Sequence, residues 1–225
     1  MSVLKKKKVA PIDITPLLVK EPMPEILRHP TIPKPLHGVA PREIWGTNWW
    51  RSVRDQVVAA QDGRCAACGV HYTESPWKQW LEVHECYNID YERGLLTLDK
   101  VVGLCKRCHN FIHSGRLVAL VSKKEMDKTT ALNVMFHGLS VLESNGLEPG
   151  RSTIEAMNLF GIDHVFSVEK TPKHMQDWGG WRLELGGKEY FSKFNSLQEW
   201  YDNYNGDGAF EKLAAGGADA DICFV

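Results

Sequence analysis

Four cysteines of this chain occur as two Cys-x-x-Cys pairs, a residue type and spacing that bind zinc. The first pair is Cys65 and Cys68, and the second is Cys105 and Cys108. Zinc prefers a tetrahedral set of four thiolates, and two such pairs from distant parts of a chain commonly supply them. The alternative is a set of buried apolar thiols. The paired spacing favours metal, so we predict a structural zinc site.

Three histidines lie close to these cysteine pairs in the sequence. His109 and His113 are four residues apart, so a helix starting at the second pair projects both imidazoles from one face. His84 lies in the segment 80–85 (WLEVHE), whose alternation is typical of a strand beside that helix. Such a cluster can hold a second metal ion. The alternative is that the three rings only pack against the cysteine site.

The order and spacing of these residues resemble the HNH family of nucleases. The ββα-metal core of that family joins a strand with a histidine dyad, a loop with an asparagine and a helix with two histidines, and many members add two cysteine pairs. The resemblance covers residues 65–113, about 50 of 225. It implies that His84, His109 and His113 bind a divalent ion (Mg, Mn, Ni or Zn), which polarises a scissile phosphate.

Two positions depart from the pattern of this family. Glu85 stands where the family has the second histidine of the dyad, the general base that activates water. A carboxylate can fill that role when burial raises its pKa, but it can also be a fourth ligand or an exposed strand residue. Lys100 stands at the asparagine position, and Asp99 can replace it after a shift of one residue. The resemblance thus implies four catalytic residues: Glu85, His84, His109 and His113.

The predicted elements divide the chain into three parts. Residues 1–45 contain eight prolines and a run of lysines, typical of an extended basic arm that either straps the core or forms a tail. Residues 46–122 hold the zinc-binding HNH-like domain, which begins with a helix predicted at 47–60. Residues 123–225 form an acidic α+β region. The expected fold class is therefore α+β, with a zinc-stabilised ββα-metal core, a Pro-rich N-terminal arm and a mixed helix and β-hairpin C-terminal region.

Turn and capping signals predict the elements that follow the histidines. Ser-Gly after His113 should end the helix, and residues 116–121 are predicted to form a short strand or an extended segment. Helices are predicted over 123–145 and, from a capping box, over about 152–160. Alternation across a Gly-Gly turn predicts a β-hairpin at 181–191, and a second capping box predicts a short helix after Ser196.

The uneven distribution of charge bears on the partners of the protein. The arm has eight basic and four acidic residues, whereas residues 123–225 have ten basic and sixteen acidic ones. The arm can contact nucleic-acid phosphates, and the acidic region favours a protein partner instead. Arg51 and Arg54 of the first helix can also meet phosphates, although solvated surface arginine is the simpler interpretation. We therefore expect DNA as a partner, with a protein partner for the acidic region.

Several isolated residues are interpreted as structural. His137, His164 and His174 stand alone in the sequence and are expected to be ordinary structural or surface residues. Cys86 and Cys223 lie outside the cysteine pairs and are expected to be plain thiols. The tryptophans at 77 and 80 are expected to cover the core or the zinc site rather than to stack on bases.

Composition favours a cytoplasmic globular protein. The chain is 43% hydrophobic, which suffices for a buried core, but it has no apolar run of about 18 residues and no signal-like start. Four of six cysteines are explained by zinc spacing, which argues against disulfides. No membrane contact is expected.

Two functions remain open from the sequence. The first is a divalent-metal-dependent DNA endonuclease or nickase of HNH type, favoured by the three histidines. The second is a non-catalytic zinc module that binds protein or nucleic acid as a regulatory or assembly factor. Glu85 and Lys100 favour the second function, because they replace the catalytic residues of the family. We expect the nuclease, because a pure scaffold would not need His113.

Overall fold

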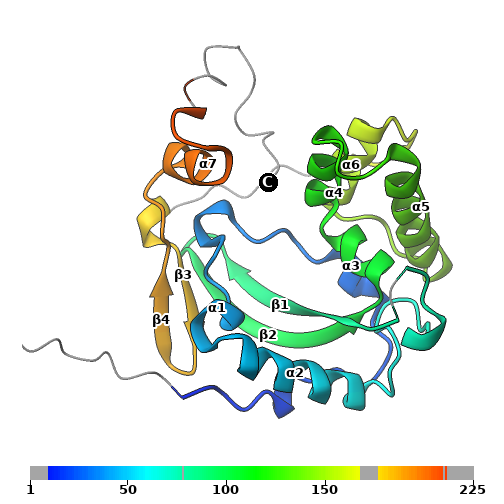
Figure 1. Ribbon diagram of the computed structural model, residues 1–225, viewed down its shortest axis with the longest axis horizontal. Coiled ribbons are helices and arrows are strands. Elements are labelled where there is room, and N and C mark those ends of the chain that lie inside the picture. The colour runs from blue at the N-terminus through cyan, green and yellow to red at the C-terminus, as the bar shows by residue number, and fades with distance from the viewer. Residues whose placement is uncertain (1–9, 78, 168–176, 210, 212–225) are drawn as a thin grey trace, which may run out of the picture.

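The computed structural model describes residues 10–77, 79–167, 177–209 and 211 as an α+β fold around one mixed sheet (Figure 1). The strand order is β1-β2-β3-β4, so β1 lies at an edge. β1 and β2 are antiparallel, β2 and β3 are parallel, and β3 and β4 are antiparallel. The strands are β1 (Glu82–Asp90), β2 (Leu95–Leu104), β3 (Arg182–Leu185) and β4 (Lys188–Phe191).

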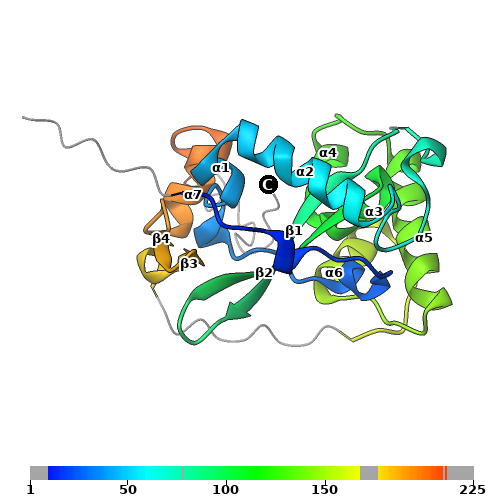
Figure 2. The ribbon, with the colours of Figure 1, turned by 90° about the horizontal axis from the view of Figure 1, so that it is seen from below.

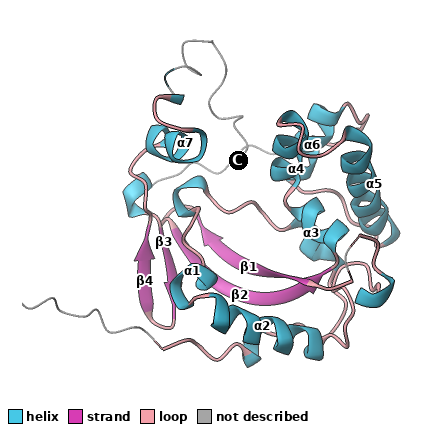
Figure 3. Cartoon of the chain, in the orientation of Figure 1, coloured by secondary structure: helices cyan, strands magenta, loops and turns pink. Residues whose placement is uncertain are grey.

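Seven α-helices within the described residues cover this sheet. α2 lies along one face of the β1–β2 hairpin, and α3 to α6 gather on the other side (Figure 1; Figure 3, helices in cyan). None of the helices in the described ranges is both long enough and apolar enough to cross a membrane. The helices are α1 (Pro41–Trp45), α2 (Thr47–Ala60), α3 (Lys106–Ile112), α4 (Ser114–Ser122), α5 (Lys128–Ser144), α6 (Arg151–Phe160) and α7 (Leu197–Asn205).

The β1–β2 hairpin is packed on both faces, because successive side chains of a strand point to opposite sides. On one face, Val101 packs with Val53 and Val57 of α2. On the other face, Val102 and Leu104 join the largest core, which α3 to α6 complete. The part of the hairpin around Val101 and Val102 therefore lies between α2 and the helical cluster, whereas Tyr87 and Leu96 pack in a third core with β3.

The N-terminal segment packs against the core over its described part. It forms three 3-10 turns, at Thr15–Leu17, Pro24–Arg28 and Lys34–Leu36. Ile26 and Leu27 of the second turn are buried in the largest core. Leu18 forms a parallel bridge with Val101 of β2, and Figure 2 shows the segment (blue) running along the molecule. The prolines thus shape a strap whose apolar residues face the core.

Two predicted elements between the histidines and the C-terminal region were wrong. Residues 116–121 are not a strand but belong to the helix α4, where Leu117 is fully buried. A short apolar run fits a buried strand or a buried helix equally well, so periodicity alone could not separate them. The next helix, α5, begins at Lys128 rather than at 123. Asp127 caps it, since its Oδ1 accepts a hydrogen bond from the Thr130 amide at 2.8 Å.

Other predicted elements are confirmed. α2 spans the predicted residues 47–60, although Gly46 is the N-cap. The 181–191 hairpin is β3 and β4, and α7 begins after Ser196, whose Oγ accepts a hydrogen bond from the Glu199 amide at 3.1 Å. α6 is also present, but its N-cap is Gly150 and no side chain caps it. The first glycine of the hairpin turn, Gly186, has φ of 57°, as a tight two-residue connection requires.

Close packing of α3 on α5 gives a first prediction. Gly138 of α5 lies against the buried ring of Phe111, and a Cβ at this position would overlap that ring. Gly138→Ala should therefore lower the free energy of unfolding by about 1–3 kcal/mol, as overpacking does, although alanine is the better helix former. Urea unfolding of the metal-loaded protein measures this change.

The matched control is Ser140→Ala, an exposed position of the same helix. It should leave stability unchanged or raise it slightly. Equal stability of Gly138→Ala and wild type would contradict the packing described for Phe111.

Candidate metal centres

The two cysteine pairs meet where the loop after α2 contacts the start of α3. Cys105 is the N-cap of α3 and Cys108 lies in its first turn. The sulfur atoms of Cys65, Cys68, Cys105 and Cys108 lie within 4.8 Å of one another. The amide of Ala66 donates to the carbonyl of Gly103 at 2.9 Å, which ties the first pair to the end of β2. Four thiols from two elements fit one tetrahedral zinc ion.

The four sulfur atoms exchange hydrogen bonds, which shift their pKa values in opposite directions. Hydrogen bonds from the thiols of Cys108, Cys65 and Cys68 hold the pKa of Cys105 far below its ordinary value, whereas hydrogen bonds within the cluster raise the pKa of Cys65 and Cys108. Three of the four cysteines are buried and Cys68 is half-buried. A buried thiolate is costly without a cation, so the set has the chemistry of a metal-binding site. Cys86 is buried elsewhere in the core, as expected of a plain thiol, and burial raises its pKa to about 12.

His137 contacts this centre, which the sequence did not indicate. Nε2 of His137, from α5, lies 3.4 Å from the sulfur of Cys108. Hydrogen bonds with the thiols of Cys105 and Cys68 raise the pKa of His137 to about 9. A protonated ring can donate to a metal-bound thiolate and stabilise its charge. His137 therefore supports the cysteine centre rather than being an isolated structural residue. His164 is half-buried, contacts Asn158 and stacks on Phe166, whereas His174 lies outside the described residues.

The three predicted histidines also come together. His84 comes from β1, His109 from α3, and His113 is the residue that ends α3. Their ligand nitrogens lie within 4.8 Å of one another. His84 is only 4% exposed, and its Nε2 has no hydrogen-bond partner among the described residues. A buried nitrogen without a partner, facing two other imidazoles, fits a divalent metal ion.

Burial keeps two of these rings neutral, as metal ligation requires. Burial, followed by the charges of His113 and His109, lowers the pKa of His84 well below its ordinary value. Burial also lowers the pKa of His113 to about 3, with smaller effects from His109 and Arg116. The unprotonated nitrogens are then free to bind a cation at neutral pH.

Glu82 positions His109, and this residue was also missed. Oε2 of Glu82 lies 2.7 Å from Nδ1 of His109, and Oε1 accepts a hydrogen bond from Nζ of Lys106 at 2.9 Å. Burial alone would raise the pKa of Glu82, but His109 and then Lys106 lower it to about 2. A carboxylate on Nδ1 leaves Nε2 of the ring for a metal. The sequence signal was available, because Glu82 and His84 share one face of β1.

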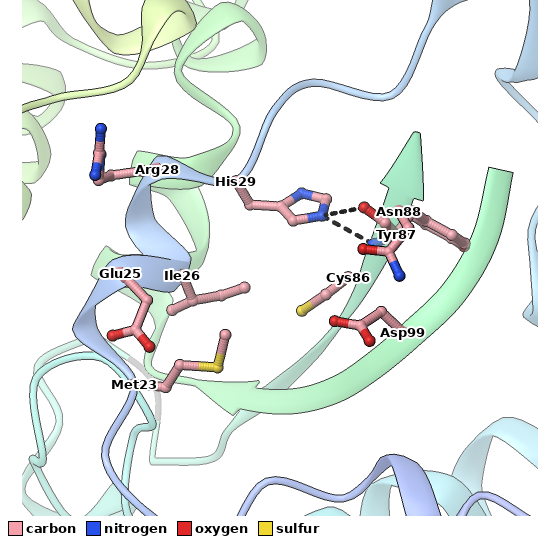
Figure 4. Close-up of a pocket in the computed structure, with 9 residues that line it drawn as sticks. All are labelled: Met23, Glu25, Ile26, Arg28, His29, Cys86, Tyr87, Asn88 and Asp99. Carbon is pink, nitrogen blue, oxygen red and sulfur yellow. Dashed lines mark hydrogen bonds between the residues drawn. The ribbon is translucent and has the colours of Figure 1, made fainter. Parts of the chain in front are cut away.

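A fourth histidine, His29, lies behind the cluster. Its ring centroid is 5.6 Å from that of His84. The amide of Tyr87 donates to Nε2 of His29 at 2.8 Å, and the carbonyl of Tyr87 lies 3.3 Å from the same nitrogen (Figure 4). This contact occupies Nε2, so His29 is a packing partner of His84 rather than a ligand. It also borders a cavity of about 190 Å³ beside Cys86.

Glu85 lies on the other face of β1. Its partner in the register is Val101, so it points toward α2, whereas His84 is opposite Val102 and points toward α3. Glu85 is half-buried, and burial raises its pKa to about 7. It lines a groove of about 810 Å³ that runs along the β1 edge and is also lined by His109. Glu85 and His109 therefore reach the same groove, Glu85 from the face of β1 that points toward α2 and His109 from α3.

Lys100 and Asp99 occupy the position where the HNH family, which the sequence resembles, has its asparagine. Nζ of Lys100 lies 2.8 Å from Oδ2 of Asp99. The register of the hairpin shifts here, because Cys86 pairs with Lys100 but Tyr87 pairs with Leu98. The side chain of Asp99 lines the small cavity next to His29 (Figure 4). The pairing of β1 with β2 thus shifts by one residue at this point. Asp99 then lines the cavity beside His29 instead of the groove that His109 and Glu85 line.

Comparisons with protein-family models, curated proteins and solved structures found no match for this chain. The described residues form two candidate metal centres, one of four cysteines and one of three histidines, and both include side chains of the short helix α3.

The two centres should respond differently to substitution. Cys105→Ala should remove the zinc and unfold the central region, because structural zinc supplies on the order of 10 kcal/mol of apparent folding free energy. His113→Ala should keep the fold and the cysteine-bound zinc and lose only the metal of the histidine cluster. Metal content by atomic absorption and circular dichroism report these outcomes.

Cys86→Ala is the matched control, since this buried thiol is outside the cluster. It should retain the full metal content. A folded Cys105→Ala variant, or a collapsed His113→Ala variant, would reverse the assignment of structural and accessory centres.

His137→Leu tests the contact with Cys108. Loss of the N–H donor should weaken zinc retention by about 10–100-fold, as removal of outer-shell partners does. His137→Gln keeps an N–H donor, so its zinc retention should lie between that of wild type and that of His137→Leu. Zinc release to a competing chelator measures the effect, and His164→Leu, at a half-buried histidine outside the cysteine centre, is the control. Identical release from His137→Leu and wild type would count against this role.

Proposed function

We propose that this protein is a divalent-metal-dependent nuclease that hydrolyses phosphodiester bonds in DNA on an HNH-like ββα-metal core. The observation that carries the proposal is the cluster of His84, His109 and His113, of which His109 lines a groove that is also lined by a half-buried carboxylate, Glu85. Neutral imidazoles, an accessible groove and an acidic group beside it are the parts that metal-assisted hydrolysis requires.

The succession of elements supports this proposal. β1 carries His84, β2 returns antiparallel to it, and α3 follows directly with His109 and His113. This is the order of strand, strand and helix in the ββα-metal core that the sequence resembles. The cysteine centre braces the same helix at its first turn, as the paired cysteines of many HNH proteins would.

Each residue then has a defined part in hydrolysis. A divalent ion bound by the three histidines would supply the Lewis acidity that polarises the phosphate and stabilises charge on the leaving oxygen. Glu85 accepts the proton of the attacking water from the other side of the β1 edge. Glu82 holds the ring of His109 in place through the 2.7 Å contact with Nδ1.

A second candidate is a non-catalytic module that binds nucleic acid or protein. The observation that favours it is the Lys100–Asp99 pair, which stands where the family has its asparagine. The two candidates differ in one property, hydrolysis, and share the groove and the metal centres.

Nicking of supercoiled plasmid in Mg, Mn, Ni or Zn tests the proposal. Wild type should cleave with at least one of these ions, and His109→Ala should be inactive because a metal ligand is lost. Glu85→Gln should lower the rate about 10²–10⁴-fold, the usual contribution of a general base.

The matched control for Glu85→Gln is Glu92→Gln, an exposed residue in the β1–β2 turn, which should retain full activity. Circular dichroism and zinc content first establish that each variant is folded. Absence of cleavage by folded, metal-loaded wild type with every ion would refute the nuclease and leave the binding module.

A further inference from the structure

The groove beside the histidine cluster has a wall built by one face of α2. Trp50, Arg51 and Arg54 line it, at spacings of one, three and four residues that place them on adjoining parts of the helix surface. Val53 and Val57 of α2 pack on the sheet, and Trp50, which lies on the same stripe of the helix, packs partly against them. Burial of this stripe fixes the rotation of the helix, and the two arginines beside it line the groove.

The cationic side chains of the groove are available to a ligand. Arg42 and Glu43 are 3.6 Å apart, and Arg54 and Asp55 are 3.9 Å apart, with all four side chains at least half exposed. Exposed pairs at such distances contribute little energy and are readily exchanged for phosphate. Arg51 has no ion pair within the described part of the chain. Three guanidinium groups thus face one groove.

Three carboxylates also line the groove, and one of them is compensated. Glu82 is held by Lys106 and contacts His109, so its charge is already balanced. Glu43 and Glu85 are the other two, against three arginines. The arginines therefore outnumber the carboxylates that Lys106 does not hold.

Two tryptophan side chains line the same groove as these arginines. Trp80 lines the groove and is 46% exposed, and Trp50 lines it from α2. An exposed indole beside guanidinium groups offers a flat apolar surface next to phosphate-binding groups. Single-stranded nucleic acid is bound by this combination, because the face of an unpaired base can stack on an aromatic ring. In a duplex the faces of the bases are covered by their neighbours.

We propose that this groove binds a single, unpaired nucleic-acid strand, with its phosphates on Arg51, Arg54 and Arg42 and a base stacked on Trp80. The strand leads to His109, so the inference rests on the proposed nuclease and gives unpaired DNA, including the regions that negative supercoiling opens in a plasmid, as its preferred substrate. Trp80 then has a binding role, in place of the covering role that the sequence suggested.

The test is fluorescence anisotropy with a labelled oligodeoxynucleotide, alone and annealed to its complement. It uses the His113→Ala background, so that cleavage does not consume the probe; His113 does not line the groove. The single strand should bind about tenfold more tightly than the duplex or better. Trp80→Leu should weaken single-strand binding by about tenfold, the effect of losing one stacked base.

Arg51→Gln provides a second measure that does not depend on Trp80. It should weaken binding and reduce the slope of log K against log salt by about 0.7, the value for one phosphate contact on a single strand. The matched controls are Phe191→Leu, an exposed aromatic of β4, and Arg93→Gln, an exposed arginine of the β1–β2 turn. Neither should change affinity or salt slope.

Equal or tighter binding of the duplex would overturn the inference, and so would unchanged affinity in both Trp80→Leu and Arg51→Gln. The outcome is independent of cleavage. Tight single-strand binding without any nicking by wild type would retain this inference and reject the nuclease. Nicking of plasmid without preferential single-strand binding would retain the nuclease and reject this inference.

Discussion

The convergence of four thiols at the junction of β2 and α3 is the constraint on which the rest of the molecule depends. α3 is only seven residues long, too short to hold its own direction in water. Cys105 and Cys108 anchor its first turn to the loop after α2, and Phe111 packs its other end on α5. The direction of α3 decides where His109 and His113 point. The cysteine centre therefore positions the histidine centre.

The place of β1 at the edge of the sheet is the second requirement. Consecutive residues of a strand point to opposite faces, so His84 and Glu85 cannot meet across the interior of a sheet. At an edge, a groove can run past the strand and receive side chains from both faces. The groove beside β1 is lined by Glu85 from one face and by Glu82 and His109 from the other. Pairing of another strand with β1 would separate them.

Sequence spacing predicted the residues whose place follows from a repeat of three or four positions along the chain. It missed the residues that reach the site only through tertiary contacts. The cysteine pairs, the His109/His113 pair and α2 follow from periods of three and four residues. His137 was missed because it reaches Cys108 from a helix 29 residues further along the chain. α4 was mistaken for a strand because its short apolar run lacks a decisive period. Its helical form follows from burial of Leu117 among other helices.

The two centres differ in ligand number, and this difference bears on their chemistry. Four cysteines can complete a tetrahedral shell, which closes the ion to further ligands and suits a structural role. Three histidines leave a position open. The strap covers the cluster on one side, where His29 packs on His84, and the groove reaches it at His109 on the other. An incoming ligand of a metal held there would therefore approach from the groove, past the arginines of α1 and α2.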